Sequence, residues 1–166
     1  MTEARQSDLS ENSFTAGVVE LIRAWARRHD AVHGLALVGS HARGEAEPNS
    51  DVDFMLLVGD PGAFKVDGAW LGAISWASLG SRIACVEDEE YGAVWSRRVW
   101  LHPRGEIEFT FARPSWAALE PIDPGTRHVI MHGCSILHDP TGALARLSLA
   151  ARTAEDAEPY LDRRLS

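Results

Sequence analysis

Two aspartates and a glycine-serine turn in the middle of the chain have the residue types of a metal and phosphate site. Asp51 and Asp53 are separated by one residue at the start of a strand-like run, so both side chains are expected on one face of a sheet. Two like charges this close favour a cation between them, and Mg²⁺ is commonly held by such carboxylates, water and phosphates. Gly39 and Ser40 follow an apolar run and can offer backbone N–H groups and a hydroxyl to an anion such as a triphosphate.

A third carboxylate is expected from the segment EIEFTFA at residues 106–112. Apolar residues alternate there with Glu106, Glu108 and Thr110, so one face packs into the core and the other displays two glutamates. Glu108 lies in the middle of the run, where an unpaired carboxylate is costly unless it meets a metal or a cation. If this strand lies beside the aspartate strand, three acids converge on one metal site, whereas Glu106 is expected to be exposed to solvent.

Two other motif interpretations fail on single residues. Gly39 and Gly44 have the glycine spacing of a P-loop, but Glu45 stands where that loop requires lysine, and its charge would repel phosphates. The DVD triplet could open an EF-hand calcium loop, yet Met55 and Leu56 occupy positions that need a ligand and a glycine.

Hydrophobic periodicity and turn residues indicate the elements that must position these groups. The predicted elements are a helix over 13–29, a buried strand over 34–39, a strand over 51–58, a helix over 67–79, three strands over 82–86, 92–102 and 106–112, a short strand over 135–139 and a helix over 141–151. The acidic cluster Glu87–Glu90 is interpreted as the hairpin turn between the first two of those three strands. This order predicts an α/β (α+β) fold with a mixed β-sheet and helices packed mainly on one face.

Length and composition bound the function. The 166 residues predict one domain over 13–152, with a flexible leader at 1–12 and a charged tail at 153–166. The net charge of −8 argues against a nucleic-acid partner, because such binding depends on neutralising phosphates. Two cysteines give no disulfide framework, and no signal peptide or membrane-spanning run is found, so a soluble cytoplasmic protein with no membrane partner is expected.

The stretch GSHARGEAEPNSDVDF resembles the signature of the nucleotidyltransferase superfamily with the DNA polymerase beta-like fold. In that signature a Gly-Ser pair precedes an Asp-x-Asp by about ten residues, and here residues 41–50 separate them. Glu108 resembles the third carboxylate of the family, which stands on a later strand. The chain is most similar to small stand-alone bacterial members, and the resemblance extends from residue 13 to about 147.

The resemblance implies transfer of a nucleoside monophosphate from an NTP co-substrate to an acceptor, with pyrophosphate leaving. Two Mg²⁺ ions would be held by residues that are catalytic and metal-binding at once: Asp51, Asp53 and Glu108. Nucleotide contacts are expected from Gly39, Ser40, Arg43 and Ser50. For Arg43 an alternative stays open, since its guanidinium could equally pair with a local acid such as Glu45 or Glu47.

The acceptor is expected to be a hydroxyl on a small molecule, such as an aminoglycoside-like antibiotic. It would bind across a homodimer, or between the acidic turn and the C-terminal helix. One alternative is a minimal nucleotidyltransferase that adenylylates a protein partner, of the antitoxin type. Another is a nucleotide-binding module that does not catalyse.

Several other residues are open to a plain and a functional interpretation. Glu87–Glu90 is expected to be a solvated turn, with a cation-binding rim for an amino-sugar acceptor as the alternative. His128 and His132 have the spacing of zinc ligands on a helix, but they are interpreted as ordinary surface histidines. Arg97 and Arg98 are adjacent, so only one of them can face the site.

The tryptophans are assigned mainly to the core. Trp70 and Trp76 are predicted to pack between a helix and the sheet. Core packing is also the default for Trp95, Trp100 and Trp116, with a base or acceptor pocket as the alternative.

Overall fold

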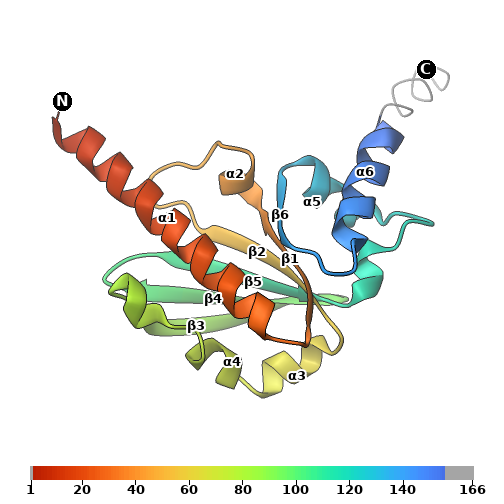
Figure 1. Cartoon of the computed structure of the whole chain (residues 1–166), viewed down its shortest axis with the longest axis horizontal. Coiled ribbons are helices and arrows are strands. Elements are labelled where there is room, and N and C mark those ends of the chain that lie inside the picture. The colour runs from red at the N-terminus through yellow and green to blue at the C-terminus, as the bar shows by residue number, and fades with distance from the viewer. Residues whose placement is uncertain (1, 156–166) are drawn as a thin grey trace.

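A six-stranded mixed sheet organises the computed structural model, which describes residues 2–155 (Figure 1). The strands are β1 (Val32–Val38), β2 (Val52–Val58), β3 (Arg82–Tyr91), β4 (Val94–His102), β5 (Glu106–Ala112) and β6 (Cys134–His138). Their order is β3-β4-β5-β2-β1-β6, with β2 and β5 parallel and the other neighbours antiparallel. The expected α+β fold with a mixed sheet is confirmed.

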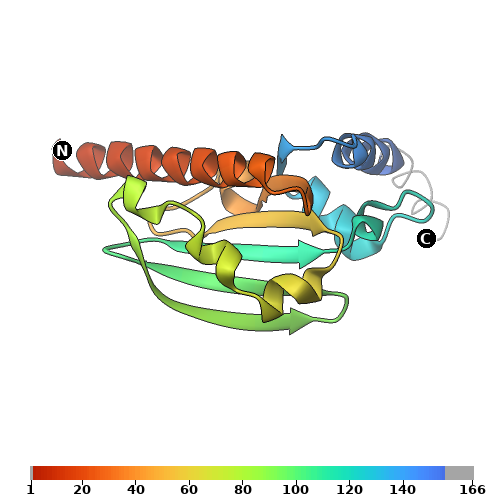
Figure 2. The ribbon, with the colours of Figure 1, turned by 60° about the horizontal axis from the view of Figure 1, so that its bottom comes forward.

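Helices cover the two faces of the sheet unequally. They are α1 (Thr2–Arg28), α2 (Gly39–Ala42), α3 (Pro61–Val66), α4 (Ala69–Gly72), α5 (Pro124–Met131) and α6 (Ala143–Glu155), with 3₁₀ helices η1 (Trp76–Leu79) and η2 (Pro114–Ala117). Side chains from α1, α3, α4 and η1 join the larger core cluster on one face, and α1 lies along that side of the sheet (Figure 2). Side chains from α5, α6 and η2 form a smaller cluster on the other face.

Strand β2 shows why the sheet is stable between these layers. Phe54, Leu56 and Val58 point into the larger cluster, while Met55 and Leu57 point into the smaller one. All five side chains are buried. The sequence from Phe54 to Val58 is continuously apolar, as is usual for a strand that is covered on both faces. The strand that carries Asp53 at its start is therefore fixed by packing from both sides.

Helix α1 begins at Thr2, so residues 2–12, expected to be a flexible leader, are helical in the structure. The segment is rich in good helix formers and contains no Pro or Gly, so nothing in it stops the helix. The Arg104 guanidinium donates to the Ser10 carbonyl at 3.2 Å and lies 5.3 Å from the Phe14 ring, which ties this part of α1 to the β4–β5 turn. Within residues 2–155 no helix is both long and apolar enough to cross a membrane.

Two other expectations about local structure are corrected. The predicted helix over 67–79 is replaced by the short α4 and η1, separated by a break, with glycines at 68 and 72 weakening any continuous helix. Glu87–Glu90 is not a turn: it continues β3, pairs with β4, and the chain reverses at Gly92, whose φ is +68°. Of the tail expected at 153–166, residues 156–166 lie outside the described part of the chain.

The ring of Phe111 should be among the strongest contributors to stability. It is fully buried, stacks on Trp95 with ring centroids 4.7 Å apart, and meets the edge of Trp70 at 5.1 Å. We expect Phe111→Ala to lower the free energy of unfolding in urea by about 3–5 kcal/mol, because a large cavity is left. Leu149→Ala is the control, because Leu149 is 70% exposed and its truncation should cost no more than about 0.5 kcal/mol. Equal losses in the two variants would contradict this assignment of the core.

Candidate active site

The three predicted carboxylates meet at one end of the β2–β5 pair. Asp53 and Glu108 are direct partners in the parallel register of these strands, and Asp51 lies just before β2. One oxygen from each of Asp51, Asp53 and Glu108 lies within 4.8 Å of the others, and each residue is half-buried. The structure therefore brings together the acid set that the sequence suggested, at a spacing that suits ligands of a shared divalent cation.

A row of charged residues crosses the sheet on this face. Asp53 is the partner of Glu108, Glu108 is the partner of Arg98 on β4, and Arg98 is the partner of Glu87 on β3. The Arg98 guanidinium forms ion pairs at 3.4 Å with Glu108 and at 3.1 Å with Glu106. Of the two adjacent arginines, Arg98 is thus the one that faces the acids, and Glu106, expected to point into solvent, is half-buried in this ion pair.

Arg97 belongs to the opposite, packed face. Its side chain is only 10% exposed and its Nε donates to Asp88 at 2.7 Å. The guanidinium lies 5.8 Å from the ring centroid of Trp70 and 5.3 Å from that of Trp95. Because the aspartate and the two aromatic faces satisfy it there, Arg97 stabilises the junction of β3 and β4 and does not reach the acids.

Gly39 makes room for one of the acids. Its φ is +75°, and a Cβ placed on it would lie 2.5 Å from Asp53 Oδ2, closer than real Cβ atoms approach. Glycine is therefore required at this position for two reasons: the backbone conformation, and the Asp53 carboxylate that occupies the space where a side chain would lie. Ser40 follows it in the short helix α2 and is half-buried.

The two remaining predicted nucleotide contacts have local partners. Arg43 Nε donates to Glu45 at 2.8 Å, and its Nη1 donates to the His132 carbonyl at 3.2 Å, so the local ion pair left open by the sequence is formed. Ser50 Oγ accepts from the backbone N–H of Glu47 at 2.9 Å, which stabilises the loop before Asp51. Arg43 still lines the same cavity as Gly39 and Asp53, whereas Ser50 lines a different one.

Two of the three acids, Asp53 and Glu108, open into a cavity of about 980 Å³, which the sequence did not predict. Asp53 and Glu108 share it with residues from distant segments, among them Tyr91, Thr110 and Trp116. A hydrogen bond to Glu89 raises the pKa of Tyr91 to about 12. Only the alternation along β5 could have indicated Thr110, because it lies on the same face as Glu108.

The other singled-out side chains divide between core and surface. Trp70, Trp76 and Trp95 are buried in the core, while Trp116 lines the cavity of the acids and Trp100 lines another. His128 and His132 are exposed and their rings stack with centroids 3.8 Å apart. Among residues 2–155 the acid trio is the only group of three or more side chains placed to hold a metal ion, so no third ligand joins the histidines.

Asp53 is the most strongly perturbed of these acids. Burial, and then the negative charges of Asp51 and Glu108, raise its pKa from 3.8 to about 7, and the Arg98 guanidinium opposes that rise. Without a bound cation this carboxyl therefore gains or loses its proton near neutral pH. A divalent cation at the trio would compete with this proton, so the site has the electrostatics expected of a metal site.

The sequence between residues 18 and 117 matches the model of the nucleotidyltransferase domain. The chain belongs to the nucleotidyltransferase domain family. The matched range covers more than half of the chain and includes the Gly39 turn and the acids from Asp51 to Glu108. The confirmed family agrees with the resemblance of the central motif. A comparison with curated proteins finds no match.

The chain is similar to two solved structures at low identity. An aminoglycoside 6-adenyltransferase from Bacillus subtilis is 13% identical with a TM-score of 0.42, and the match covers 60% of this chain and 35% of that chain. A structure of a toxin-antitoxin with AMP-PNP is 11% identical with a TM-score of 0.41, and the match covers 92% of this chain and 98% of that chain. At this similarity neither structure indicates an acceptor for this nucleotidyltransferase domain.

The space that Gly39 leaves for Asp53 can be tested with a matched pair of glycines. Gly39 and Gly44 have φ values of +75° and +72°, but a Cβ on Gly44 would meet nothing within 4 Å. Ala at either position should cost about 1 kcal/mol of unfolding free energy or more from backbone strain. Only Gly39→Ala should also weaken Mn²⁺ binding, by about tenfold or more in an EPR titration, because it displaces the Asp53 carboxylate. Equal Mn²⁺ affinity in the two variants would show that the contact with Asp53 has no role.

The raised pKa of Asp53 predicts how stability depends on pH. The folded protein binds this proton more tightly than the unfolded chain, so in a chelator the contribution is complete below about pH 4 and is lost as pH rises through about 7. The unfolding free energy of Asp53→Asn relative to wild type should therefore rise between pH 5 and 8. In Arg98→Ala the midpoint of the Asp53 titration should move higher, because the guanidinium lowers this pKa. A pH-independent difference between wild type and Asp53→Asn would contradict the assignment.

Proposed function

We propose that the protein is a Mg²⁺-dependent nucleotidyltransferase that moves a nucleoside monophosphate from an NTP to an acceptor hydroxyl. The observation that carries the proposal is the convergence of Asp51, Asp53 and Glu108, with oxygens within 4.8 Å of one another, beside the turn at Gly39. A structural role alone does not account for three crowded acids, because their mutual repulsion destabilises the fold. Family membership supports the same class of reaction.

The residues present fit a divalent metal. The donor set is all oxygen, which suits Mg²⁺, and burial together with the charges of Asp51 and Glu108 raises the pKa of Asp53 to about 7, a rise that a bound cation would oppose. Asp51, Asp53 and Glu108 would hold the metal, and the two ions expected from the family would share these ligands. A bound metal would neutralise charge at the phosphates and orient the attacking and leaving oxygens.

The chain's own residues account for the rest of the reaction. The acceptor oxygen forms a bond to the α-phosphorus while the bond from that phosphorus to the pyrophosphate oxygen breaks. Glu108 is the group proposed to take the acceptor's hydroxyl proton, and the ion pair with Arg98 holds its carboxylate in place. Gly39 and Ser40 would bind the phosphates that leave, and Arg43 lines the same cavity as Gly39.

The cavity at the acids has room for a nucleotide. Asp53 and Glu108 lie in a cavity of about 980 Å³, which is large enough for a nucleotide and at the upper end of ordinary ligand sites. The acceptor class that we propose is a hydroxyl-bearing small molecule of the aminoglycoside type. Modification of a partner protein is the alternative that acceptor screening must exclude.

Binding of NTP should depend on both the metal and the acid trio. We expect one NTP to stabilise wild type against thermal unfolding with Mg²⁺, by about 2.7 kcal/mol at a concentration of 100 Kd. Asp53→Ala should abolish this ligand-induced shift, because it removes a metal ligand. The control is Asp30→Ala, which changes an exposed aspartate and should leave the shift intact. A wild type that no NTP stabilises, with or without Mg²⁺, would overturn the proposed function.

A further inference from the structure

The sheet does not hold the three acids of the trio equally. Asp53 and Glu108 are register partners within β2 and β5, so the ladder of the sheet fixes both of them. Asp51 lies one residue before β2: the pairing with β5 begins at Val52, and the pairing with β1 ends at Asp53. The position of Asp51 therefore depends on the loop at residues 46–50 that precedes it.

Repulsion between the acids makes the anchoring of this loop necessary. One oxygen from each acid lies within 4.8 Å of the others, and like charges at that spacing repel. Because the backbone of Asp51 is the least constrained of the three, the repulsion acts mainly to move Asp51 out of the trio. A contact that holds the loop is needed to keep all three acids within reach of one cation.

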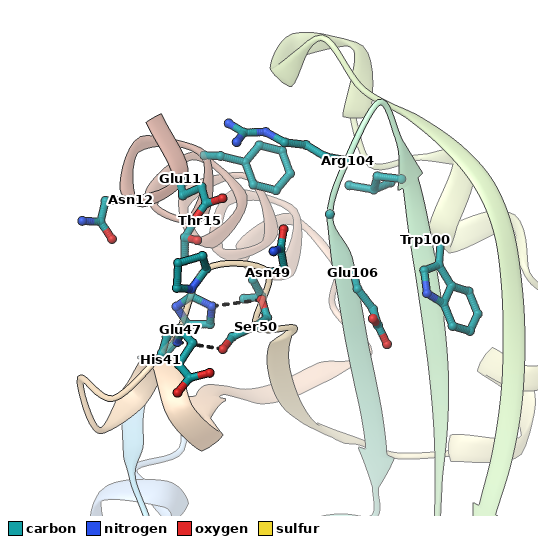
Figure 3. A pocket seen from close by; sticks show the side chains of 16 residues that line it. Glu11, Asn12, Thr15, His41, Glu47, Asn49, Ser50, Trp100, Arg104 and Glu106 are labelled. Atoms are coloured by element: carbon teal, nitrogen blue, oxygen red, sulfur yellow. Dashed lines mark hydrogen bonds between the residues drawn. The ribbon is translucent and has the colours of Figure 1, made fainter. Parts of the chain in front are cut away.

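The loop is held through Ser50, the residue before Asp51. Two of its hydrogen bonds are local: its Oγ accepts from the Glu47 N–H at 2.9 Å, and its own N–H donates to the Glu47 carbonyl at 3.0 Å. The third comes from α2, because His41 Nε2 lies 3.3 Å from the Ser50 carbonyl (Figure 3). A carbonyl oxygen only accepts, so the ring nitrogen donates. Among the residues that the structure describes, this is the one hydrogen bond that joins the loop to another element.

The short helix α2, which carries His41, is itself fixed to the rest of the domain. Ala42 packs against the larger core cluster, and the half-buried ring of His41 extends from this anchored turn. The same helix begins at Gly39, which makes room for the Asp53 carboxylate. One element thus sets both aspartates, Asp53 by direct contact and Asp51 through the bond from His41 to the loop.

We propose that His41 is a positioning residue of the metal site: its Nε2–H holds the Ser50 carbonyl, and through it the Asp51 carboxylate, within reach of the cation. The inference rests on the proposed function, in which the acid trio holds the metal. His41 contributes no ligand, since the trio consists of the three acids alone. It acts on the metal through the backbone, in the way that residues behind a metal ligand commonly set its orientation.

Mn²⁺ binding to the full-length protein, followed by EPR, tests this role. His41→Ala should weaken Mn²⁺ binding about tenfold. In His41→Gln the amide nitrogen stands as many bonds from Cβ as Nε2 does, so most of the lost affinity should return. In His41→Asn that nitrogen is one bond closer to Cβ and falls short of the carbonyl, so the affinity should stay near that of His41→Ala. His102→Ala, which changes an exposed histidine at the end of β4, is the control and should bind Mn²⁺ as wild type does.

Urea unfolding of the same samples separates positioning from a general loss of structure. Leu147→Ala empties a fully buried position in the smaller core cluster, so it should destabilise the fold more than His41→Ala does. It should nevertheless bind Mn²⁺ as wild type does, because it leaves the loop and the trio unchanged. A similar loss of Mn²⁺ affinity in Leu147→Ala and His41→Ala would show a merely structural role and would overturn the proposal.

Three further outcomes would also overturn it: unchanged Mn²⁺ affinity in His41→Ala, equal affinities in His41→Gln and His41→Asn, and a wild type that does not bind Mn²⁺. The Mg²⁺-dependent stabilisation by NTP is measured beside them. The positioning role fails alone if NTP stabilises wild type while His41→Ala keeps its Mn²⁺ affinity. The proposed function fails alone if Mn²⁺ binding depends on His41 as described but no NTP stabilises wild type.

Discussion

The close approach of Asp53 and Glu108 on neighbouring parallel strands is the constraint on which this structure depends. Two carboxylates that face each other across a register pair repel, and burial strengthens the repulsion by removing water. The fold tolerates it because β2 and β5 are held by packing that the acids do not supply. Arg98 offsets part of the negative charge from the adjacent strand, and the rest is left for a proton or a cation.

Strand β5 separates stability from chemistry by alternation. Ile107, Phe109 and Phe111 are fully buried on one face, where Trp70 contacts both phenylalanine rings. The intervening Glu108 and Thr110 line the cavity on the other face. The aromatic cluster thus fixes the position and orientation of the strand that carries the Glu108 carboxylate, and it does so from the opposite face. A strand is well suited to this division, because the pleat alone assigns neighbours to opposite faces.

The sequence predicted the acids better than their surroundings, and the reason is the range of the interactions involved. The spacing of Asp51 and Asp53 and the alternation around Glu108 are local patterns, and local patterns are visible in one dimension. The choice between Arg97 and Arg98 depends on the β4–β5 register, which no local pattern encodes. The acidic run Glu87–Glu90 looked like a turn because its charge is high. Its place in β3 is explained by the pairing with β4, which sets Arg98 opposite Glu87 and Arg97 opposite Asp88.

The same contrast between local patterns and contacts of distant segments explains why the sequence predicts the chemistry of the site but not the acceptor. The motif from Gly39 to Asp53 and the glutamate on β5 specify a place for metal and phosphate, and these demands are the same for any acceptor. The cavity that Ser50 and Trp100 line is built from α1, the loop before β2 and the β4–β5 turn, which lie outside the catalytic pattern. A net charge of −8 says little by itself, because Asp88 and Glu90 are already paired with basic partners. What matters is where negative charge is left unpaired: among the described residues neither Asp51 nor Asp53 forms an ion pair with a basic side chain, so that charge is left for a cation at the acid trio itself.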